Sequence, residues 1–427
     1  MSRLIEGVCR AAGHIRAGRI AFATGTKEWT MDWSDSPEQA AFRQEVRALL
    51  ETKLPERYKR GEGPGERTWE FDRKSDDPKA REAANAWLAA LAERRWVAPQ
   101  WPAEYGGGGL SSMEQFILNQ ELARAGAPGV GGSGIGLLGP TLIVHGTEEQ
   151  KARYLPAILN GETAWAQGYS EPSAGSDLAS LQTRAVRDGD EFVINGQKIW
   201  TSGAHTADAI FLLARTDPSA PKHRGISFLL VDDIKTPGLS VRPLIDMGDH
   251  HYFNETFFED VRIPARNLVG EENRGWYVGM TLLDFERSNI GGAVGSRRMI
   301  AGLIDDLGDA AAGATATHAV RAEIADRYIE TEVMFQFSFR IISMQNRGLV
   351  PNYEASMSKL FNSEISQRLS LTGTRAFGLH ANRWGDGSAA SRYSDAYVRA
   401  VPATIRGGTS EVQRNVIATR GLGLPRG

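Results

Sequence analysis

The sequence predicts a multidomain α+β protein with an N-terminal α-helical domain, a middle antiparallel β-sheet or β-barrel domain and a C-terminal four-helix bundle. The chain of 427 residues is too long for one ordinary hydrophobic core. Strand patterns separated by turns, without intervening helices, dominate the middle of the chain, and apolar residues repeat with the helical period on both sides. The predicted domains are 31–162, 163–274 and 275–427, preceded by a disordered extension, 1–30.

Composition narrows the class of protein. Hydrophobic residues make up 41% and charged residues 24%, which is typical of a soluble globular protein. The 49 basic and 52 acidic residues leave a net charge of −3, which gives no argument for nucleic-acid binding. One cysteine, Cys9, excludes an internal disulfide framework and favours a reducing compartment, so we expect a cytoplasmic protein. The longest uncharged run, 125–146, contains eight glycines and is not expected to span a membrane.

The N-terminal domain is expected to begin near Met31. Residues 1–30 lack the apolar central region of a secretory signal peptide. Pro37 stands where the first turn of a helix is expected. Apolar periodicity then predicts helices over 38–53, 78–95, 111–125 and 148–160.

A glycine cluster in this domain matches a dinucleotide motif only superficially. Gly129, Gly131 and Gly134 satisfy G-x-G-x-x-G. A true dinucleotide fingerprint follows a strand and opens a helix, whereas this cluster follows the predicted helix 111–125. We therefore reject a Rossmann site and expect the glycines to let helices and a ligand approach closely.

The middle domain is predicted to begin with two hairpins. Asp188-Gly189-Asp190 and Asn195-Gly196 are turn signals, because Gly and Asn accept a positive φ. They would separate three antiparallel strands, and later strand patterns complete the sheet. The predicted strands are 181–186, 191–194, 198–202, 211–214, 225–231, 239–243 and 254–261. The preceding loop, Ser170–Asp177, presents hydroxyl and amide groups that suit a flat ligand with polar edges.

From residue 275 onward the pattern is helical. Helices are predicted over 276–308, 318–346, 352–380 and 408–420, which suits a helix bundle. His250-His251 has no partner ligands at zinc spacing, so no metal site is expected.

The stretch from Gln167 to Asp208 resembles the flavin-binding segment of the acyl-CoA dehydrogenase family. In that family a Thr/Ser-Glu-Pro-x-x-Gly-Ser-Asp loop and a Trp-x-Thr/Ser strand hold the isoalloxazine ring of FAD. The matching positions here are Ser170–Asp177 and Trp200-Thr201-Ser202. The resemblance implies FAD as the cofactor and acyl-CoA as the substrate, in lipid β-oxidation chemistry. The positions that it places at FAD are Gln167, Tyr169, Ser170, Ser176, Trp200, Ser202, Thr409 and Glu411.

The catalytic base departs from the commonest family pattern. Most members carry the base as Glu in a C-terminal Tyr-Glu-Gly-Thr motif, and here that position is Gly407. Isovaleryl-CoA and long-chain acyl-CoA dehydrogenases are similar to this variant and carry the base earlier, in a Leu-Glu-Arg context. The resemblance therefore implies Glu286 as the base that removes the α-proton while hydride passes to the flavin. Gly407 would keep a role through its amide N–H, which polarises the thioester oxygen.

Other positions follow from the same resemblance. Asp284, Arg287 and Ser176 are similar to positions that line the acyl-CoA channel, with Gly407 beside them. Helical spacing puts Glu286 on the same side as apolar neighbours, where desolvation would raise the pKa of its carboxyl.

A second departure concerns assembly. Members usually carry Arg-x-x-Phe-Gly after the second bundle helix, where it binds the neighbouring subunit's FAD, and residues 305–318 lack this motif. Bacterial steroid-degrading dehydrogenases resemble this arrangement and are heterotetramers of two related subunits. A second acyl-CoA dehydrogenase-like subunit is therefore expected as partner, with electron-transferring flavoprotein as acceptor. The alternative is a homodimer or homotetramer in which Arg297, Arg298 or another basic residue replaces the missing contact.

Two other functions remain open at this point. The chain could be a non-catalytic, FAD-sharing subunit of a heteromeric acyl-CoA dehydrogenase. It could also be a flavin oxidase or monooxygenase on the same fold.

Overall fold

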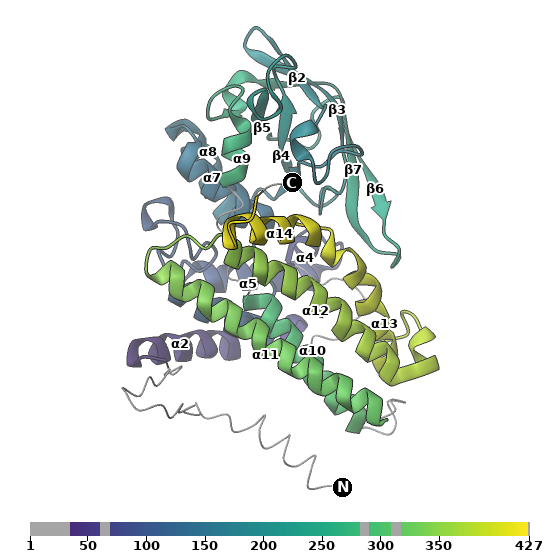
Figure 1. Cartoon of the computed structure of the whole chain (residues 1–427). Coiled ribbons are helices and arrows are strands. Elements are labelled where there is room, and N and C mark those ends of the chain that lie inside the picture. Colours follow the sequence, from purple (N-terminus) through teal and green to yellow (C-terminus); the bar gives the residue numbers. More distant parts are fainter. Residues whose placement is uncertain (1–34, 60–68, 282–289, 309–316, 426–427) are drawn as a thin grey trace.

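The computed structural model describes residues 35–59, 69–281, 290–308 and 317–425, and it confirms the predicted fold class. Figure 1 shows a sheet domain at one end of the molecule and a bundle of long helices at the other. The N-terminal helices run from beside the sheet to beside the bundle. The predicted extension 1–30 lies outside the described residues.

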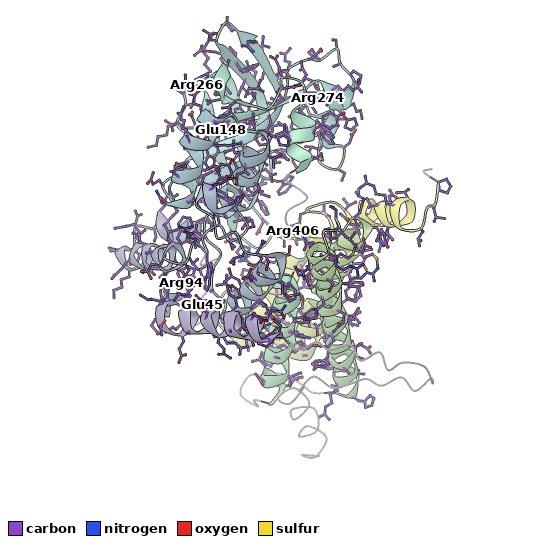
Figure 2. The ribbon with its side chains drawn as sticks, turned by 90° about the vertical axis from the view of Figure 1, so that its left-hand side faces the viewer. Glu45, Arg94, Glu148, Arg266, Arg274 and Arg406 are labelled. Carbon is purple, nitrogen blue, oxygen red and sulfur yellow. The ribbon has the colours of Figure 1, made fainter. Side chains whose placement is uncertain are left out.

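The N-terminal part is helical, as predicted. Its elements are α2 (Pro37–Lys53), α3 (Glu56–Lys59), α4 (Trp69–Arg73), α5 (Pro78–Ala92), α6 (Ser112–Ala125), α7 (Gly139–His145) and α8 (Glu148–Leu159). Pro37 opens α2, and the side chains of Ser36 and Gln39 form a reciprocal cap with the backbone there. Figure 2 shows Glu45 and Arg94 side by side, where they pair α2 with the turn that follows α5.

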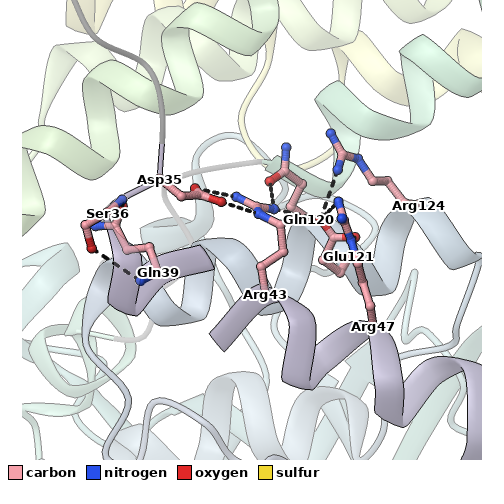
Figure 3. A network of polar contacts seen from close by, with 8 residues as sticks. All are labelled: Asp35, Ser36, Gln39, Arg43, Arg47, Gln120, Glu121 and Arg124. Carbon is pink, nitrogen blue, oxygen red and sulfur yellow. Dashed lines mark hydrogen bonds and ion pairs between the residues drawn. The ribbon is translucent and has the colours of Figure 1, made fainter. Parts of the chain in front are cut away.

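A buried carboxylate joins α2 to α6 (Figure 3). Glu121 on α6 accepts hydrogen bonds from Arg43 at 2.6 Å, Arg47 at 2.9 Å and Arg124 at 2.9 Å. Arg43 also binds Asp35 in a two-pronged contact, with N···O distances of 2.6 and 2.9 Å. Burial alone would raise the pKa of the Glu121 carboxyl, but the arginines outweigh it and hold that pKa below its usual range.

The glycine cluster forms helix, and part of it serves close packing. Residues Gly134–Leu138 make a π-helical turn that continues directly into α7. A Cβ on Gly139 would lie 1.8 Å from the ring of Trp101, which is fully buried. Among the described residues, the element before this turn is the helix α6, so the cluster lacks the strand–turn–helix order of a dinucleotide fingerprint.

Replacing Gly139 by alanine should therefore destabilise the protein by about 1–3 kcal/mol, because the added methyl must displace Trp101. Gly136→Ala is the matched control, since its Cβ would meet no atom within 4 Å. The measurement is the midpoint of thermal unfolding for both variants. Equal midpoints for both would show that Trp101 does not restrict this position.

The middle domain is an eight-stranded sheet in the order β6-β7-β3-β2-β4-β5-β8, with β1 paired to β4. The strands are β1 (Trp165–Gly168), β2 (Arg184–Asp188), β3 (Glu191–Lys198), β4 (Ala209–Arg215), β5 (Ile226–Val231), β6 (Leu239–Ile245), β7 (His251–Pro264) and β8 (Leu268–Val269). The sheet is antiparallel except where β4 meets β1 and, at one residue pair, β2. Both faces of β4 and β5 are buried.

One of the two predicted hairpins is correct. Gly189 has φ +61° and turns β2 into β3, where Asp188 pairs with Glu191. The second was wrong: Asn195-Gly196 lies inside β3, at a bulge in the pairing with β7. The Asn195 side chain bonds Asp260 across the two strands, so the long β7 keeps this segment extended.

The C-terminal part is a four-helix bundle of α10 (Ile290–Gly308), α11 (His318–Asn346), α12 (Tyr353–Phe377) and α13 (Ala389–Ala400). The shorter α14 (Ser410–Val416) packs on α12, whereas α9 (Gly275–Thr281) packs against β4 and β5 of the sheet domain (Figure 1). The predicted segment 276–308 is described only as α9 and α10. The sequence analysis missed α13, which depends on long-range packing: the Tyr393 ring stacks on Phe377 at 5.3 Å, and its hydroxyl donates to Asp306 at 2.8 Å.

Candidate active site

The loop Ser170–Asp177 follows β1 and is pinned at its start. Glu171 and Ala174 exchange two backbone hydrogen bonds of 3.0 Å, which closes a tight turn around Pro172. The amide of Ile199 donates to the carbonyl of Ser170 at 2.9 Å, tying the loop to the end of β3. The loop is therefore held by the sheet and has a defined shape.

A buried ion pair lies beneath this loop. The ammonium of Lys198, fully buried, contacts a carboxylate oxygen of Glu171 at 2.7 Å and the carbonyl of Tyr169 at 3.1 Å. Glu171 also accepts hydrogen bonds from the backbone amides of Gln182 at 2.6 Å and Thr183 at 2.9 Å. Burial alone would raise the pKa of the Glu171 carboxyl, but Lys198 and these amides outweigh it and hold the pKa below its usual value. One carboxylate thus joins the loop, β3 and the segment before β2.

Trp200 lies directly after β3 in an unusual conformation. Its φ is +60°, which is rare for a residue with a side chain and concentrates at functional sites. The side chain is 54% exposed, and its ring meets Phe253 edge-on at 5.6 Å between centroids. The backbone is fixed on both sides, because Thr201 and Gly203 donate to carbonyls of Asn254 and Tyr252. The structure therefore holds an indole at the surface on a rigid backbone.

The other predicted cofactor positions of this domain surround the same segment. Gln167, Ser170 and Ser202 are partly exposed, and Ser176 is exposed at the loop tip. The Tyr169 side chain instead points into the core, with its ring edge-on to Phe211 at 6.0 Å. Burial raises the pKa of the Tyr169 phenol. Any cofactor contact at Tyr169 would therefore involve its backbone.

The segment before α14 carries the second group of predicted residues. Gly407 and Gly408 have φ of +64° and +92°, so the chain turns sharply between α13 and α14. The ammonium of Lys359 on α12 donates to the carbonyls of Ala403 at 3.3 Å and Gly408 at 2.5 Å. Burial and the neighbouring charge of Arg406 lower the pKa of the Lys359 ammonium. Lys359 thus holds both ends of the turn that presents Gly407.

Thr409 and Glu411 complete this segment. The Thr409 hydroxyl accepts a hydrogen bond from the Val412 amide at 3.2 Å and caps α14. Glu411 is exposed, and the pKa of its carboxyl is lowered by backbone and Thr409 hydrogen bonds. Figure 2 shows Arg406 on the side of the bundle that faces the sheet domain.

The predicted residues therefore form two groups, one around the ends of β1 and β3 and one around the start of α14. Among the described residues, no recorded hydrogen bond or ion pair joins the two groups. The sheet domain and the bundle do meet elsewhere: His250 Nε2 lies 2.9 Å from a carboxylate oxygen of Asp395 on α13. Asp284, Glu286 and Arg287 lie outside the described residues.

Sequence reasoning missed the two lysines that hold these groups. For Lys198, the missed signal is a charged residue on the same strand, β3, as the buried residues Phe192 and Ile194. For Lys359, it is a charge on a helix face that is otherwise lined by small serines. Both lysines act on backbone carbonyls, which a residue pattern does not display.

Comparison with known proteins decides the family. Residues 36–162, 166–261 and 273–422 match the N-terminal, middle and C-terminal domains of acyl-CoA dehydrogenase, in that order. The chain belongs to the acyl-CoA dehydrogenase family. The enzymes of this family are oxidoreductases that act on the CH–CH bond of an acyl-CoA.

Several family members are similar over most of their length. Acyl-CoA dehydrogenase IpdE1 of Mycobacterium tuberculosis is 38% identical over 350 residues, which cover 81% of this chain and 89% of the relative. A solved structure described as the Tcur3481-Tcur3483 steroid ACAD is 36% identical with a TM-score of 0.79, and the match covers 93% of this chain and all of that one. The ChsE4-ChsE5 complex from Mycobacterium tuberculosis is 34% identical, with a TM-score of 0.74 and coverage of 93% and 100%.

Two kinds of feature are absent from the described part of this chain. No helix there is long and apolar enough to cross a membrane. No group of three or more His, Cys, Asp or Glu side chains there could hold a metal ion.

Proposed function

We propose that this chain is the catalytic subunit of an FAD-dependent acyl-CoA dehydrogenase that introduces the α,β-double bond of an acyl-CoA thioester. The observation that carries the proposal is Trp200, an exposed indole held at positive φ beside the Glu171-anchored loop. The enzyme would consist of three domains, 31–162, 163–274 and 275–427. We place the enzyme in the cytoplasm, with electron-transferring flavoprotein as its acceptor.

The residues present fit FAD. A flat ring system needs an apolar face to lie on and polar groups along its edges. The indole of Trp200 offers the face, and Ser170, Ser176 and Ser202 offer exposed hydroxyls near it. Gln167 lies partly exposed on β1, while Thr409 and Glu411 would contribute from the C-terminal segment. Bound FAD would supply the acceptor for the substrate's hydride.

The chain's own residues would supply the proton chemistry. Glu286 would remove the proton from the carbon next to the thioester carbonyl. The Gly407 amide N–H would donate to the thioester oxygen and so stabilise the charge that develops there. Asp284, Arg287 and Ser176 would line the path of the acyl-CoA. This assignment of roles rests on the resemblance to the family's motifs, and Lys359 supports it by fixing the turn at Gly407.

We also propose that a second, related subunit completes the cofactor site. The sequence lacks the arginine motif that usually reaches into the neighbouring subunit. Two arginines named as possible replacements, Arg297 and Arg298, are already bound within the chain. Arg297 pairs with Glu332 and lies 3.4 Å from the centre of the Phe335 ring, and Arg298 donates to the carbonyl of Ala123 at 3.1 Å. Two structurally similar assemblies carry paired names, Tcur3481-Tcur3483 and ChsE4-ChsE5.

Purified protein tests the whole proposal. We expect the chain expressed alone to hold less than one FAD per chain and to gain flavin when a related subunit is co-expressed. Losing the arginine contact should weaken FAD retention roughly tenfold or more. Anaerobic titration of the flavin-loaded protein with linear, branched and ring-bearing acyl-CoA esters should bleach the flavin absorbance.

Each other outcome would identify a different function. One tightly held FAD per chain in an active homo-oligomer would remove the second subunit from the proposal. Bound flavin that no acyl-CoA bleaches would indicate a non-catalytic, FAD-sharing subunit. Rapid oxygen consumption by the reduced protein would indicate an oxidase or monooxygenase.

A further inference from the structure

We propose that the acyl group accepted by this enzyme is a bulky one that carries a hydroxyl group away from the thioester, recognised by Ser358 and Asn362 inside the helix bundle. This inference rests on the proposed function, because it concerns the substrate of the same site. It is argued from a cavity in the helix bundle, one wall of which, on α12, carries polar side chains.

The cavity lies among α10, α12, α13 and the segment that leads to α14. Its volume is about 890 Å³, and Gly407, the proposed partner of the thioester oxygen, is part of its wall. A group that extends from a thioester at Gly407 could therefore enter the bundle. Gly295 on α10 also lines the cavity, and a Cβ there would meet no atom within 4 Å. Glycine at that position leaves room for a ligand and does not serve tight packing.

The α12 wall of this cavity is polar. Ser356, Lys359, Ser363, Ser366 and Ser370 line it at spacings of three and four residues, which places them on one face of the helix. Pockets for small molecules are mostly apolar, with a few placed polar groups. Lys359, Ser363, Ser366 and Ser370 already bond to backbone carbonyls, so a ligand would gain polar contacts only from groups of this wall that have no partner.

Two polar atoms in this wall lack partners. The Ser358 hydroxyl and Asn362 Oδ1 are buried and make no hydrogen bond within the described residues. Ser358 as a residue is only 1% exposed, so bulk water does not reach its side chain. Other hydroxyls nearby are already engaged: Ser366 donates to the carbonyl of Asn362 and Ser370 to that of Ser366, both at 2.7 Å. Buried polar atoms are normally paired, so these two atoms in the cavity wall are available to bond a polar ligand.

The chemistry of the two atoms specifies that ligand. Asn362 Oδ1 can only accept a hydrogen bond, whereas the Ser358 hydroxyl can donate or accept. A ligand hydroxyl satisfies both, since it donates to Asn362 and accepts from Ser358. Lys359, Arg399, Arg406 and Arg420 also line the cavity, and no acidic side chain does so among the described residues. This positive surrounding favours an oxygen-bearing acyl group over a cationic one.

Matched pairs of thioesters test the inference on the flavin-loaded enzyme, with its second subunit if one is needed. Lithocholoyl-CoA carries one ring hydroxyl and 5β-cholanoyl-CoA is the same ring system without it. 4-Hydroxycyclohexanepropanoyl-CoA and cyclohexanepropanoyl-CoA form a shorter pair. We expect the hydroxylated member of at least one pair to reduce the flavin with a kcat/KM roughly tenfold higher.

Ser358→Ala should lower this preference roughly fivefold while leaving the flavin spectrum unchanged. Ser366→Ala is the matched control, since its hydroxyl lines the same cavity but is bonded to its own helix. Equal kcat/KM within both pairs, or equal effects of the two substitutions, would overturn the inference.

The outcomes separate this inference from the proposed function. Flavin bleaching by any thioester without a hydroxyl preference refutes the inference and leaves the function standing. If no thioester bleaches the flavin, the proposed dehydrogenase function is wrong. The affinity of the protein for the same pairs of thioesters, measured by calorimetry, then tests the inference. Tighter binding of a hydroxylated ester that Ser358→Ala removes would support it, and equal binding would overturn it.

Discussion

Replacing Glu286 by glutamine should leave FAD bound and slow flavin reduction by acyl-CoA by about 10²–10⁴-fold, the usual contribution of a positioned general base. Glutamine keeps the size of the side chain and removes its ability to take up a proton. The measurement is the rate of flavin bleaching under anaerobic stopped-flow conditions, together with the flavin absorbance before substrate is added. Because the loss concerns proton removal, saturating substrate should not restore the rate.

Glu271→Gln is the matched control for this prediction. Glu271 is an exposed carboxylate in the turn between β8 and α9, and its neutralisation should change neither flavin content nor rate. The double variant Glu286→Gln, Gly407→Glu tests whether a glutamate at the commoner family position can act as the base. A near-normal rate of flavin reduction in Glu286→Gln itself would contradict the assignment of the base.

The fold could be predicted from the sequence wherever local signals and tertiary packing agree. Pro37 at the start of α2 and Gly189 between β2 and β3 behave as their residue types dictate. Asn195-Gly196 carries an equally strong turn signal, yet β7 pairs along its whole neighbourhood and keeps it extended. A turn signal therefore determines the path of the backbone only where pairing with a distant strand does not compete with it.

The candidate site, like the fold, could be predicted from the sequence only in part. The sequence identifies Trp200 and the loop Ser170–Asp177, because their residue types are unusual and stand in a characteristic order. It does not reveal that Trp200 has a positive φ, since that conformation depends on bonds to the backbone around Asn254. It also does not reveal the supports, Lys198 and Lys359, whose ammonium groups bind main-chain carbonyls of distant segments.

Replacing Lys198 by methionine should destabilise the folded protein by about 3–5 kcal/mol and release the loop Ser170–Asp177, because it leaves the buried charge of Glu171 without its partner. The two backbone amides that bond Glu171 remain, but they do not neutralise a carboxylate enclosed by the sheet. Thermal unfolding reports the stability, and the FAD content of the purified protein reports the loop.

The double variant Lys198→Met, Glu171→Gln is the control that separates charge from packing. Both side chains keep their approximate size and neither is charged, so most of the lost stability should return. If the double variant is as unstable as Lys198→Met alone, the lysine acts by packing and the ion-pair account is wrong.

Acid provides an independent test of the same pair. The folded-state pKa of the Glu171 carboxyl lies below the ordinary glutamate value of 4.5, so its stabilising contribution is fully present above that value. The contribution is lost as the pH falls through the lower folded-state pKa, because the carboxyl must then be protonated in the folded protein. The wild type should therefore lose more stability below pH 4.5 than the double variant does. Parallel pH profiles for the two proteins would show that folding does not lower the pKa of the Glu171 carboxyl, and that the ion pair with Lys198 does not stabilise its charge.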